Sequence, residues 1–448
     1  MWDAVASVLT QAFTVLDRLL QGSSSSSWRW RVWQEAAAAY GLSFAERITS
    51  RESWPALRAW AGPIEVRFEE TARNSTRLVV VVPGHPGFVG VTIRRKEAKP
   101  SGAPGIEIGD ELFDRTFHIS GPAWLIRALF DAEARRLLLR ANGWCRLETV
   151  GGELRAEMPE AHLANLLPYL LEISRHLAQP VDIPRRLRGN ALRDPEAGVR
   201  LHNLRLLIRD HRLDPETAEA LRTACADASP EIRLLAAKEL GAEGREVLLE
   251  LAESTLGDTL SAEAVSSLGR DLPIERARAL LGRVLHSDHV QTARACLEAL
   301  GASTAAEDID TLAKVMAEET NELAAAAATA LGLTGSPAAE PLLIQALQDE
   351  PEEIQVAAAN ALARAGTAAA VLPLKEVAER VSYYPEARKA ARQAIAEIQS
   401  RLQGASPGQL SIAGTEAGQL SLAPDEAGQL SLAKDPAGQL SLSGGEEV

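Results

Sequence analysis

Residues 338–365 read AAEPLLIQALQDEPEEIQVAAANALARA, and this stretch decides the fold. It predicts a helix over 338–348, a turn at Asp349-Glu350-Pro351 and a second, alanine-rich helix over 352–365. Proline is favoured at the start of a helix because the amide hydrogen that it lacks would have no partner there. Alanine runs allow neighbouring helices to approach closely. The stretch therefore predicts a pair of closely packed helices.

The helix pair recurs along the chain. A leucine near the end of each alanine-rich helix marks the period, with successive spacings of 28, 32, 31 and 31 residues across Leu240, Leu268, Leu300, Leu331 and Leu362. Leu207 precedes this series by 33 residues, and Ile395 follows it by 33. A fixed period in this range is the signature of a helical solenoid. The sequence therefore predicts about seven helix pairs over residues 181–404, of which the third is the least regular.

The turns within the pairs recur as Asp194-Pro195, Asp227–Pro230 and Ser287-Asp288. The dipeptides Val199-Arg200 and Ile232-Arg233 follow the first two turns and lead into the helices that end in the leucine anchors. This pattern resembles HEAT repeats, in particular the short kind found in phycobilisome lyases. The resemblance implies an all-α superhelical solenoid whose surface binds protein partners. Some members of this class are lyases that act on bilin cofactors. Because the resemblance lies in packing positions, we expect no such chemistry and no cofactor here.

The first 180 residues have a different character. All eight tryptophans and all seven phenylalanines precede residue 145. Hydrophobic residues alternate with charged ones over 64–69, which predicts a half-buried strand. Further strands are predicted over 77–82, 88–95, 113–120, 144–150 and 154–158, with hairpin turns at Pro83–Gly87 and Gly151-Gly152. Helices are predicted over 28–40, 123–129, 132–140 and 160–177. These elements predict an α+β domain with an antiparallel sheet over residues 28–180.

The order of these elements resembles a class of uncharacterised bacterial domains. The pattern opens with W-x-x-A-A-x-x-x-G-L, continues with a sheet, and has G-D-x-x-F-D-x-x-F before paired helices. The matching residues are Trp33, Ala36, Ala37, Gly41, Leu42, Gly109, Asp110, Phe113, Asp114 and Phe117. The resemblance covers about a quarter of the chain, and it implies no known activity.

Both ends of the chain lie outside these two domains. Residues 1–22 predict an amphipathic helix that packs on its own domain, and the serine run 23–27 predicts a flexible linker. The segment WRWRVW (28–33) suits contact with a membrane or a single-stranded nucleic acid, but anchors in a domain core are the favoured interpretation. Residues 405–448 hold four decapeptide copies, with glutamines at 409, 419, 429 and 439. They predict a disordered tail with four short extended segments that could add as strands to a partner.

The charge limits the class of partner. The chain carries 47 basic and 61 acidic side chains, a net charge of −14. The predicted solenoid alone has 25 basic and 35 acidic residues, so we expect protein partners of basic or mixed charge and no direct binding of nucleic acid. Three cysteines without a CxxC pair indicate a reducing compartment, and the first residues do not have the pattern of a signal peptide. The expected location is the cytoplasm.

Two clusters of polar residues are candidates for a chemical site. Asp110, Glu111, Asp114 and His118 are the first, because a strand over 113–120 would place Asp114 and His118 on one face, where they could bind a metal or transfer a proton. His286 and His289, with Asp288 between them, are the second. Neither cluster has the further ligands or motif that such a site needs. We therefore expect a solvated strand face and a polar turn, with no catalytic, cofactor-binding or metal site.

The favoured function is a non-enzymatic scaffold that binds protein partners through the solenoid surface, with a possible contribution from the tail. Two alternatives remain open. One is an enzyme or ligand sensor with a site in the α+β domain near Asp110–His118. The other is a peripheral membrane adaptor held by residues 2–20 and WRWRVW.

Overall fold

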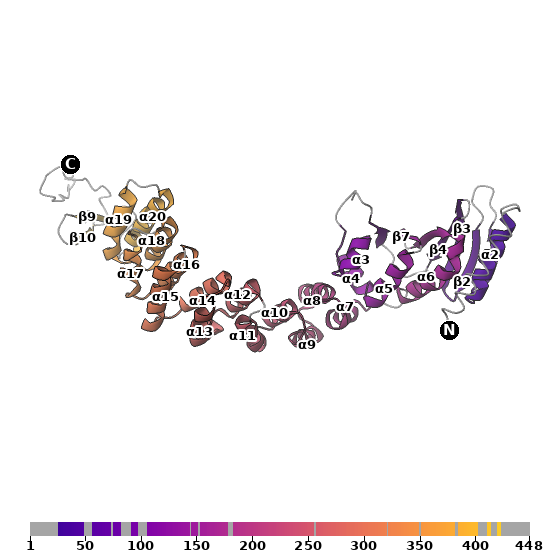
Figure 1. Cartoon of the computed structure of the whole chain (residues 1–448), viewed down its shortest axis with the longest axis horizontal. Helices are drawn as coiled ribbons and strands as arrows, with labels where there is room; N and C mark the ends of the chain where they lie inside the picture. The colour runs from indigo at the N-terminus through magenta and orange to yellow at the C-terminus, as the bar shows by residue number, and fades with distance from the viewer. Residues whose placement is uncertain are drawn as a thin grey trace, which may run out of the picture. The chain divides into compact units, whose positions relative to one another are not determined.

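The computed structural model describes residues 26–48, 56–72, 75–81, 91–96, 105–143, 145–150, 153–177, 182–254, 257–319, 321–348, 351–380, 384–401, 410–413 and 419–422. The predicted helix over residues 1–22, the predicted turns at Pro83–Gly87 and Gly151-Gly152, and most of the tail lie outside these residues. The chain forms two compact units, one within residues 1–240 and one within 241–448 (Figure 1).

Eight antiparallel strands form one sheet in the first unit, in the order β1-β2-β3-β4-β8-β7-β5-β6. In chain order they are β1 (Ser43–Ile48), β2 (Ala56–Ala61), β3 (Ile64–Ala72), β4 (Ser75–Val81), β5 (Thr92–Arg95), β6 (Phe117–Ser120), β7 (Arg146–Val150) and β8 (Glu153–Pro159). The prediction of an antiparallel sheet in this part of the chain is confirmed. The sequence does not predict β1 and β2, because alanine is a weak strand former and their hydrophobic alternation is poor.

The strand order corrects the predicted hairpin between residues 77–82 and 88–95. Strand β4 pairs with β3 and β8, whereas β5 pairs with β6 and β7. The β7–β8 hairpin therefore lies between β4 and β5. Leu154 and Ala156 of β8 stand opposite Val80 and Leu78 of β4, and all four are buried. The match between these two rows of hydrophobic residues favours the pairing of β4 with β8. It outweighs the turn residues at Pro83–Gly87, which predict a hairpin of β4 with β5.

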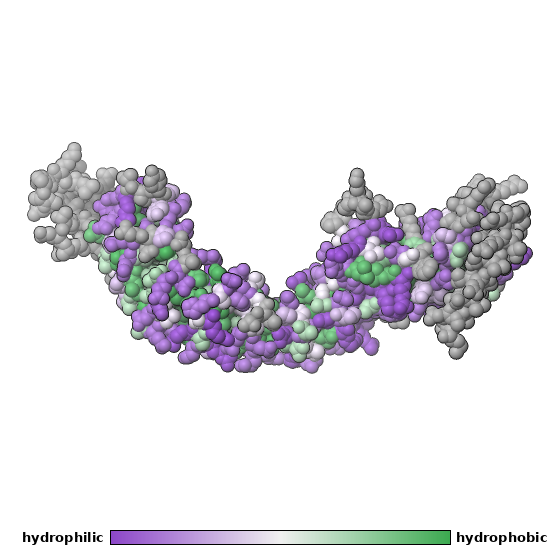
Figure 2. Space-filling view, in the orientation of Figure 1, coloured by the Kyte–Doolittle hydropathy of each residue, from purple (hydrophilic) through white to green (hydrophobic). Residues whose placement is uncertain are grey.

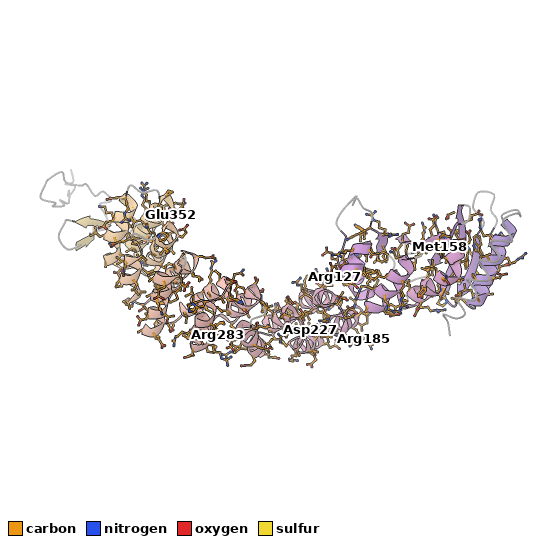
Figure 3. The ribbon with its side chains drawn as sticks, viewed as in Figure 1. Arg127, Met158, Arg185, Asp227, Arg283 and Glu352 are labelled. Carbon is orange, nitrogen blue, oxygen red and sulfur yellow. The ribbon has the colours of Figure 1, made fainter. Side chains whose placement is uncertain are left out.

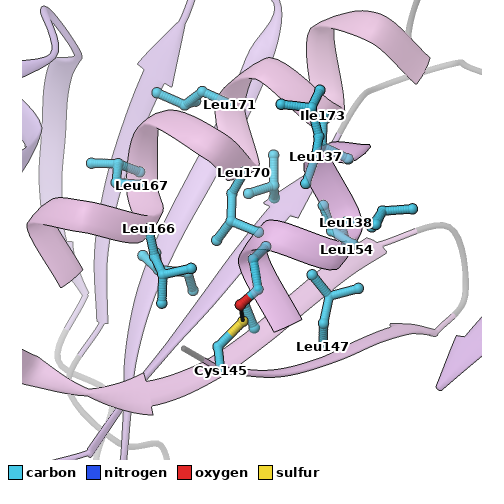
Figure 4. Packing of buried hydrophobic residues seen from close by; sticks show 14 of the residues in the cluster. Leu137, Leu138, Cys145, Leu147, Leu154, Leu166, Leu167, Leu170, Leu171 and Ile173 are labelled. Carbon is cyan, nitrogen blue, oxygen red and sulfur yellow. Dashed lines mark hydrogen bonds between the residues drawn. The ribbon is translucent and has the colours of Figure 1, made fainter. Parts of the chain in front are cut away.

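Helices α2 (Ser26–Ala39), α5 (Ala132–Asn142) and α6 (Leu163–Leu177) cover the sheet (Figure 1). A hydrophobic core lies beneath them, in which Trp33 of α2 contacts Phe68 of β3. Figure 4 shows its centre, where leucines of α5 and α6 pack over β7 and β8, and where the Cys145 thiol donates a hydrogen bond to the Ala141 carbonyl. Helix α2 begins at Ser26, so it includes the last two residues of the predicted serine linker.

The other face of the sheet carries charged residues that alternate with the buried ones, as predicted for residues 64–69. Val66 and Phe68 are buried, while Arg67 between them pairs with Glu153 of β8. Such cross-strand ion pairs fit a sheet with one face on the core and one face toward water.

Two helix pairs complete the first unit. They are α7 (Ile183–Arg193) with α8 (Ala197–His211), and α9 (Pro215–Ala224) with α10 (Pro230–Leu240). Helices α7 and α8 contact α4 (Ala123–Leu129), the short helix after β6. Where α8 begins, Gly198 lies so close to Gly109 that a Cβ atom on Gly109 would come within 2.3 Å of the Gly198 carbonyl carbon. The sheet and the first four helices of the predicted solenoid thus belong to one compact unit, which ends at Leu240.

Five further helix pairs form the second unit. They are α11 (Arg245–Glu253) with α12 (Asp258–Leu268), α13 (Ile274–Val284) with α14 (Val290–Leu300), α15 (Ala306–Glu318) with α16 (Asn321–Thr334), α17 (Ala339–Gln345) with α18 (Glu352–Ala365), and α19 (Val371–Glu379) with α20 (Pro385–Arg401). The second helix of each pair packs on the second helix of the next. The described residues therefore contain the long run of paired helices that the sequence predicts.

The leucine anchors and the small residues after them have a clear packing role. Leu300, Leu331 and Leu362 are fully buried. A Cβ atom on Gly332 would lie 2.4 Å from the Cβ atom of Ala361 in the next second helix. Glycine after the leucine therefore permits the close approach of α16 and α18.

Acidic residues at the turns link successive helix pairs. The Asp258 carboxylate at the start of α12 accepts hydrogen bonds from the amides of Gln291 and Thr292, at 2.9 and 2.8 Å, at the start of α14. Glu352 at the start of α18 (Figure 3) accepts from the Glu386 amide of α20 at 2.8 Å. These contacts satisfy helix N-terminal amides that have no partner within their own helix.

Two of the predicted extended segments of the tail are strands. Strand β9 (Leu410–Ala413) and strand β10 (Gln419–Leu422) belong to the first two decapeptide copies. They pair antiparallel, with Leu422 opposite Leu410. The extended conformation agrees with the prediction, whereas the pairing of one copy with another is a feature that the sequence does not predict.

Candidate functional site

The first predicted cluster lies on a helix instead of a strand. Residues Glu111–Thr116 form α3, and only Phe117–Ser120 belong to β6. Asp110 is the N-cap of α3, because its carboxylate accepts a 3.0 Å hydrogen bond from the Phe113 amide. An aspartate cap followed by an acidic first turn stabilises a helix N-terminus, and this signal outweighs the alternation that predicts a strand.

The two aspartates of this cluster hold the fold together. The Asp114 carboxylate accepts hydrogen bonds from the amides of Ile108 and Gly109, at 2.9 and 2.8 Å. The second oxygen of Asp110 accepts a 2.8 Å hydrogen bond from the guanidinium of Arg135. His118 lies on β6, in register with Arg94 of β5. Asp110 and Asp114 therefore point to separate partners, and the shared strand face expected for Asp114 and His118 is not formed.

Arg135 connects the sheet domain to the first helix pair. Its guanidinium, 2% exposed, binds both oxygens of Asp194 at 2.8 and 2.9 Å and the Phe130 carbonyl at 3.0 Å. Burial acts to lower the pKa of Arg135, but its hydrogen bonds to Asp194 and Asp110 outweigh burial and raise it. The sequence identifies Asp194 only as part of a turn. Nothing in the spacing of Asp110, Arg135 and Asp194 indicates that they meet.

The second predicted cluster lies where α13 meets α14. His289 is the residue before α14. Burial acts to raise the pKa of Asp258, but hydrogen bonds from the amides of Gln291 and Thr292 and from the Thr292 hydroxyl outweigh burial and lower it, and His289 lowers it further. His286 and Asp288 are exposed, and His289 is half-buried. Within the described part of the chain, no three His, Cys, Asp or Glu side chains are placed to hold a metal ion.

The WRWRVW segment supports the core of the first unit. Trp30 and Trp33 are buried, and the Trp33 indole donates a 3.0 Å hydrogen bond to the Thr76 hydroxyl. Arg29 is 3% exposed and forms a 2.9 Å ion pair with Glu160. These contacts support the interpretation of this segment as core anchors. No helix among the described residues is long and hydrophobic enough to cross a bilayer.

The candidate interaction surface lies on α4 and α8. We name the set Trp124, Arg127, His202, Arg205 and Arg209 the α4–α8 surface. Trp124 is 43% exposed, although tryptophan is usually among the most buried residues. His202, Arg205 and Arg209 are spaced by three and four residues, which places them on one face of α8. Figure 2 shows a hydrophobic area over α3 and α4 with hydrophilic surface around it.

The charges of the α4–α8 surface are only partly compensated. Arg127 (Figure 3) donates to the Glu107 carbonyl at 3.0 and 3.3 Å, and neither it nor Arg205 forms an ion pair with a carboxylate among the described residues. Burial lowers the pKa of Arg127, and the charges of Arg209 and Arg205 lower it further. Burial also lowers the pKa of His202, helped by Arg127 and Arg205, so its ring is neutral near pH 7. Arg209 is paired with both oxygens of Asp210 at 2.7 Å, so Arg127 and Arg205 are the two arginines of this surface that form no ion pair among the described residues.

Comparison with known proteins identifies the helical repeats. Residues 318–396 match the family model of HEAT repeats. This match begins at the last residue of α15 and runs through α16 to α19 and into α20, of which only the last five residues lie beyond it. No curated protein sequence matches the chain significantly.

Several solved structures are similar to part of the chain. One is an engineered protein, with 22% identity over 41% of this chain and 96% of the other, at a TM-score of 0.28. The Escherichia coli protein YibA has 18% identity over 49% of this chain and 82% of its own, with a TM-score of 0.34. The complex of CpcE and CpcF of phycocyanin lyase from Nostoc sp. PCC7120 has 21% identity over 49% of this chain and 96% of the matched chain, with a TM-score of 0.30.

Proposed function

Because residues 318–396 are HEAT repeats within a longer run of helix pairs, we propose that the chain is a non-enzymatic scaffold that binds another protein. Stacked helix pairs bury their cores between neighbours and leave a continuous surface, which is the usual binding site of such repeats. Three free cysteines fit a reducing compartment, and a cytoplasmic location is part of the proposal.

The observation that carries the proposal is the α4–α8 surface. An exposed tryptophan on the same surface as Arg127 and Arg205, which form no ion pair among the described residues, has the composition of an interaction hot spot, since tryptophan and arginine dominate binding energies at protein interfaces. We propose that a partner places an apolar side chain against Trp124 and carboxylates against Arg127 and Arg205. The partner is therefore a protein with an acidic segment that includes an apolar residue.

A protein segment fits this surface better than a nucleic acid. Residues 1–240 hold 32 basic and 30 acidic side chains, whereas residues 241–448 hold 15 and 31. A long polyanion would be repelled by the acidic excess of the second unit. A short acidic segment needs only Arg127 and Arg205 of the α4–α8 surface.

The proposal is tested by affinity purification of the full-length chain from its native host. The wild type is compared with the double variant Trp124→Ser/Arg205→Glu and with Arg140→Glu, a matched charge reversal at an exposed arginine of α5. A partner recovered by the wild type and by Arg140→Glu is then purified and titrated. Loss of the tryptophan contact alone corresponds to roughly 2 kcal/mol, so we expect its Kd for the double variant to rise about thirtyfold or more. Equal affinity of the double variant would refute the assignment of the site.

The absence of an enzymatic role is tested at His118. Asp110 caps α3 by accepting a hydrogen bond from the Phe113 amide, and Asp114 accepts one from the Gly109 amide. These contacts support a structural role for the cluster. His118→Ala should therefore leave the partner affinity and any cellular phenotype of the protein unchanged, provided that the variant folds. A lost phenotype in a variant that folds and binds its partner would favour an enzyme or sensor instead.

A further inference from the structure

Helices α19 and α20 form the last helix pair of the second unit, at the end of its helical run in Figure 1. Within this unit the second helix of each earlier pair is covered by the second helix of the next. For α18 this contact is close, because a Cβ atom on Gly366 would lie 3.3 Å from the Cδ1 atom of Ile398 in α20, and the Arg401 guanidinium donates a 2.7 Å hydrogen bond to the Gly366 carbonyl. No second helix follows α20 among the described residues. One side of α20 is therefore left without a covering helix in the described part of the chain.

Comparison with α18 identifies the residues on that side. Four residues of α18 are buried, each at most 5% exposed: Gln355, Ala359, Leu362 and Ala363. The residues 33 positions later in α20 are exposed or half-buried: Arg388, Arg392, Ile395 and Ala396. Because the two helices occupy successive places in the repeat, the difference in burial shows which side chains of α20 a following pair would cover. We name these four residues of α20 the end face.

The end face has a positive part and an apolar part. The Nε atom of Arg388 is buried without a hydrogen-bond acceptor, and a buried donor of this kind calls for a partner. Arg392 is exposed and donates a 3.5 Å hydrogen bond to the Ala378 carbonyl. Ile395 and Ala396 follow Arg392 by three and four residues, so they lie beside it on the same side of α20.

The carboxylates of α18 and α20 nearest the end face are engaged by other donors. Glu386 pairs with Lys389, and Glu397 accepts a 2.8 Å hydrogen bond from a glutamine of α20. Glu352 of α18 accepts hydrogen bonds from two backbone amides at the start of α20. Neither arginine of the end face forms an ion pair with a carboxylate among the described residues.

The end of the chain supplies a segment of complementary composition. Residues 423–448 carry five acidic side chains and one lysine, whereas α20 carries four basic and two acidic residues. The same segment holds the third and fourth decapeptide copies, each with two leucines. Carboxylates suit Arg388 and Arg392, and leucine side chains suit Ile395 and Ala396.

The segment begins within reach of the end face. The chain leaves α20 at Arg401, and the pairing of β9 with β10 turns it back so that Leu422 stands opposite Leu410. Residue 423 therefore begins beside a point nine residues from the end of α20, which an extended chain spans in about 30 Å at most. The distance along α20 from Arg401 to Arg388 is about 20 Å. A tether this short keeps the segment at a high effective concentration near the end face of its own chain.

We propose that residues 423–448 dock on the end face and cap the helical repeats. Carboxylates of the segment pair with Arg388 and Arg392, and its leucines cover Ile395 and Ala396. Terminal repeats of a solenoid need such a cover, because the side that would pack on a further repeat otherwise faces water. This proposal is independent of the proposed scaffold function, since it uses no residue of α4 or α8.

The test is hydrogen exchange of the full-length wild type, Arg392→Glu and Arg364→Glu. Arg364 is an exposed arginine of α18 at the position that matches Glu397, outside the end face, so it controls for the charge reversal. Residues 423–448 have the same sequence in all three proteins, and their exchange therefore reports docking. We expect this segment to exchange about tenfold faster or more in Arg392→Glu than in the wild type or in Arg364→Glu, because the variant loses a charge-assisted hydrogen bond and repels the carboxylates.

A second variant changes the docking segment instead of the helix. Asp425→Asn/Glu426→Gln should speed exchange at residues 427–448 about threefold or more, and it keeps the test valid if Arg392→Glu fails to fold. Wild-type rates should not change when the protein is diluted tenfold, because the segment docks on its own chain.

Three results would overturn the proposal. The first is a wild type in which residues 423–448 exchange as fast as an unstructured peptide. The second is an exchange rate of this segment that is the same in the wild type, in Arg392→Glu and in the tail variant. The third is an exchange rate that falls as the protein concentration rises, because the end face would then be covered by a second copy of the chain.

Discussion

Arg135 is the residue at which the contacts between the sheet and the first helix pair converge. It is held by Asp194, Asp110 and the Phe130 carbonyl. Removing one member of a buried ion pair leaves a charge without compensation inside the protein. Arg135→Met should therefore lower the free energy of unfolding by roughly 3–5 kcal/mol. Urea unfolding of the full-length chain measures this.

The neighbouring Arg136 is the control for this prediction. Arg136 forms an ion pair with Glu133, and the two side chains are 42% and 43% exposed. An exposed pair contributes little, so Arg136→Met should cost less than about 1 kcal/mol. Equal effects of the two substitutions would mean that Arg135 does not connect the parts of the first unit.

Asp131 makes the stability of the first unit depend on pH in acid. Burial acts to raise the pKa of Asp131, but hydrogen bonds from His176 and from the Ala134 amide outweigh burial and lower it. A carboxylate whose pKa is lower in the folded state stabilises the fold above its unfolded pKa of about 3.9, and that stability is lost as the pH falls through the folded pKa. The melting temperature should therefore fall more steeply below about pH 4 for the wild type than for Asp131→Asn. A melting temperature that falls equally steeply with pH in the two proteins would contradict this prediction.

At the scale of elements, the helix pairs could be predicted because their signals are local and repeated. Leu331 and Leu362 follow a fixed spacing, and the structure gives the reason, since each fills the same buried position in its pair. The sequence does not predict helix α3, because residues 113–120 also alternate like a strand. The cap at Asp110 is the signal that could have identified it. The order of strands in the sheet depends on pairing between distant segments, which no single segment encodes.

The close approach of second helices predicts opposite effects for two glycines. Gly332→Ala places a Cβ atom against Ala361, so it should destabilise the second unit by about 1–3 kcal/mol. Gly282 also lies in a helix, α13, but a Cβ atom there has open space around it. Gly282→Ala should therefore stabilise the protein by about 0.5–1 kcal/mol, because alanine favours the helix. Thermal or urea unfolding distinguishes the two signs, and a stabilising Gly332→Ala would show that α16 and α18 are not in close contact.

At the scale of the molecule, the first compact unit includes α7 to α10. Truncation after Leu240 keeps Asp194 and Gly198, whereas truncation at residue 180 removes both from contact with Arg135 and Gly109. A chain that ends at Leu240 should unfold in one cooperative transition at a higher urea concentration than a chain that ends at residue 180. Equal midpoints would restore the domain boundary that the sequence predicts near residue 180. The sequence predicts that boundary from the change between an aromatic-rich and an alanine-rich composition. A change in composition carries no information about contacts between the two sides of the boundary.

Function could be predicted from the sequence only at the level of the repeat class. The period identifies a surface-forming fold, but Trp124 and Arg205 come from separate parts of the chain, and only the packing of α4 on α8 brings them together. Asp131 and Arg186 likewise come from separate parts of the chain, and only the packing of the fold brings α5 and α7 together there.

The most direct test of the scaffold account is hydrogen exchange of the full-length chain with and without its purified partner. The account predicts slower exchange in α4 and α8 when the partner is bound, and unchanged exchange in β3, β4 and β8 of the sheet. It also predicts that this protection disappears in Trp124→Ser/Arg205→Glu. Protection confined to segments outside the helix pairs and α4 would contradict the account, as would a partner that leaves exchange in α4 and α8 unaltered.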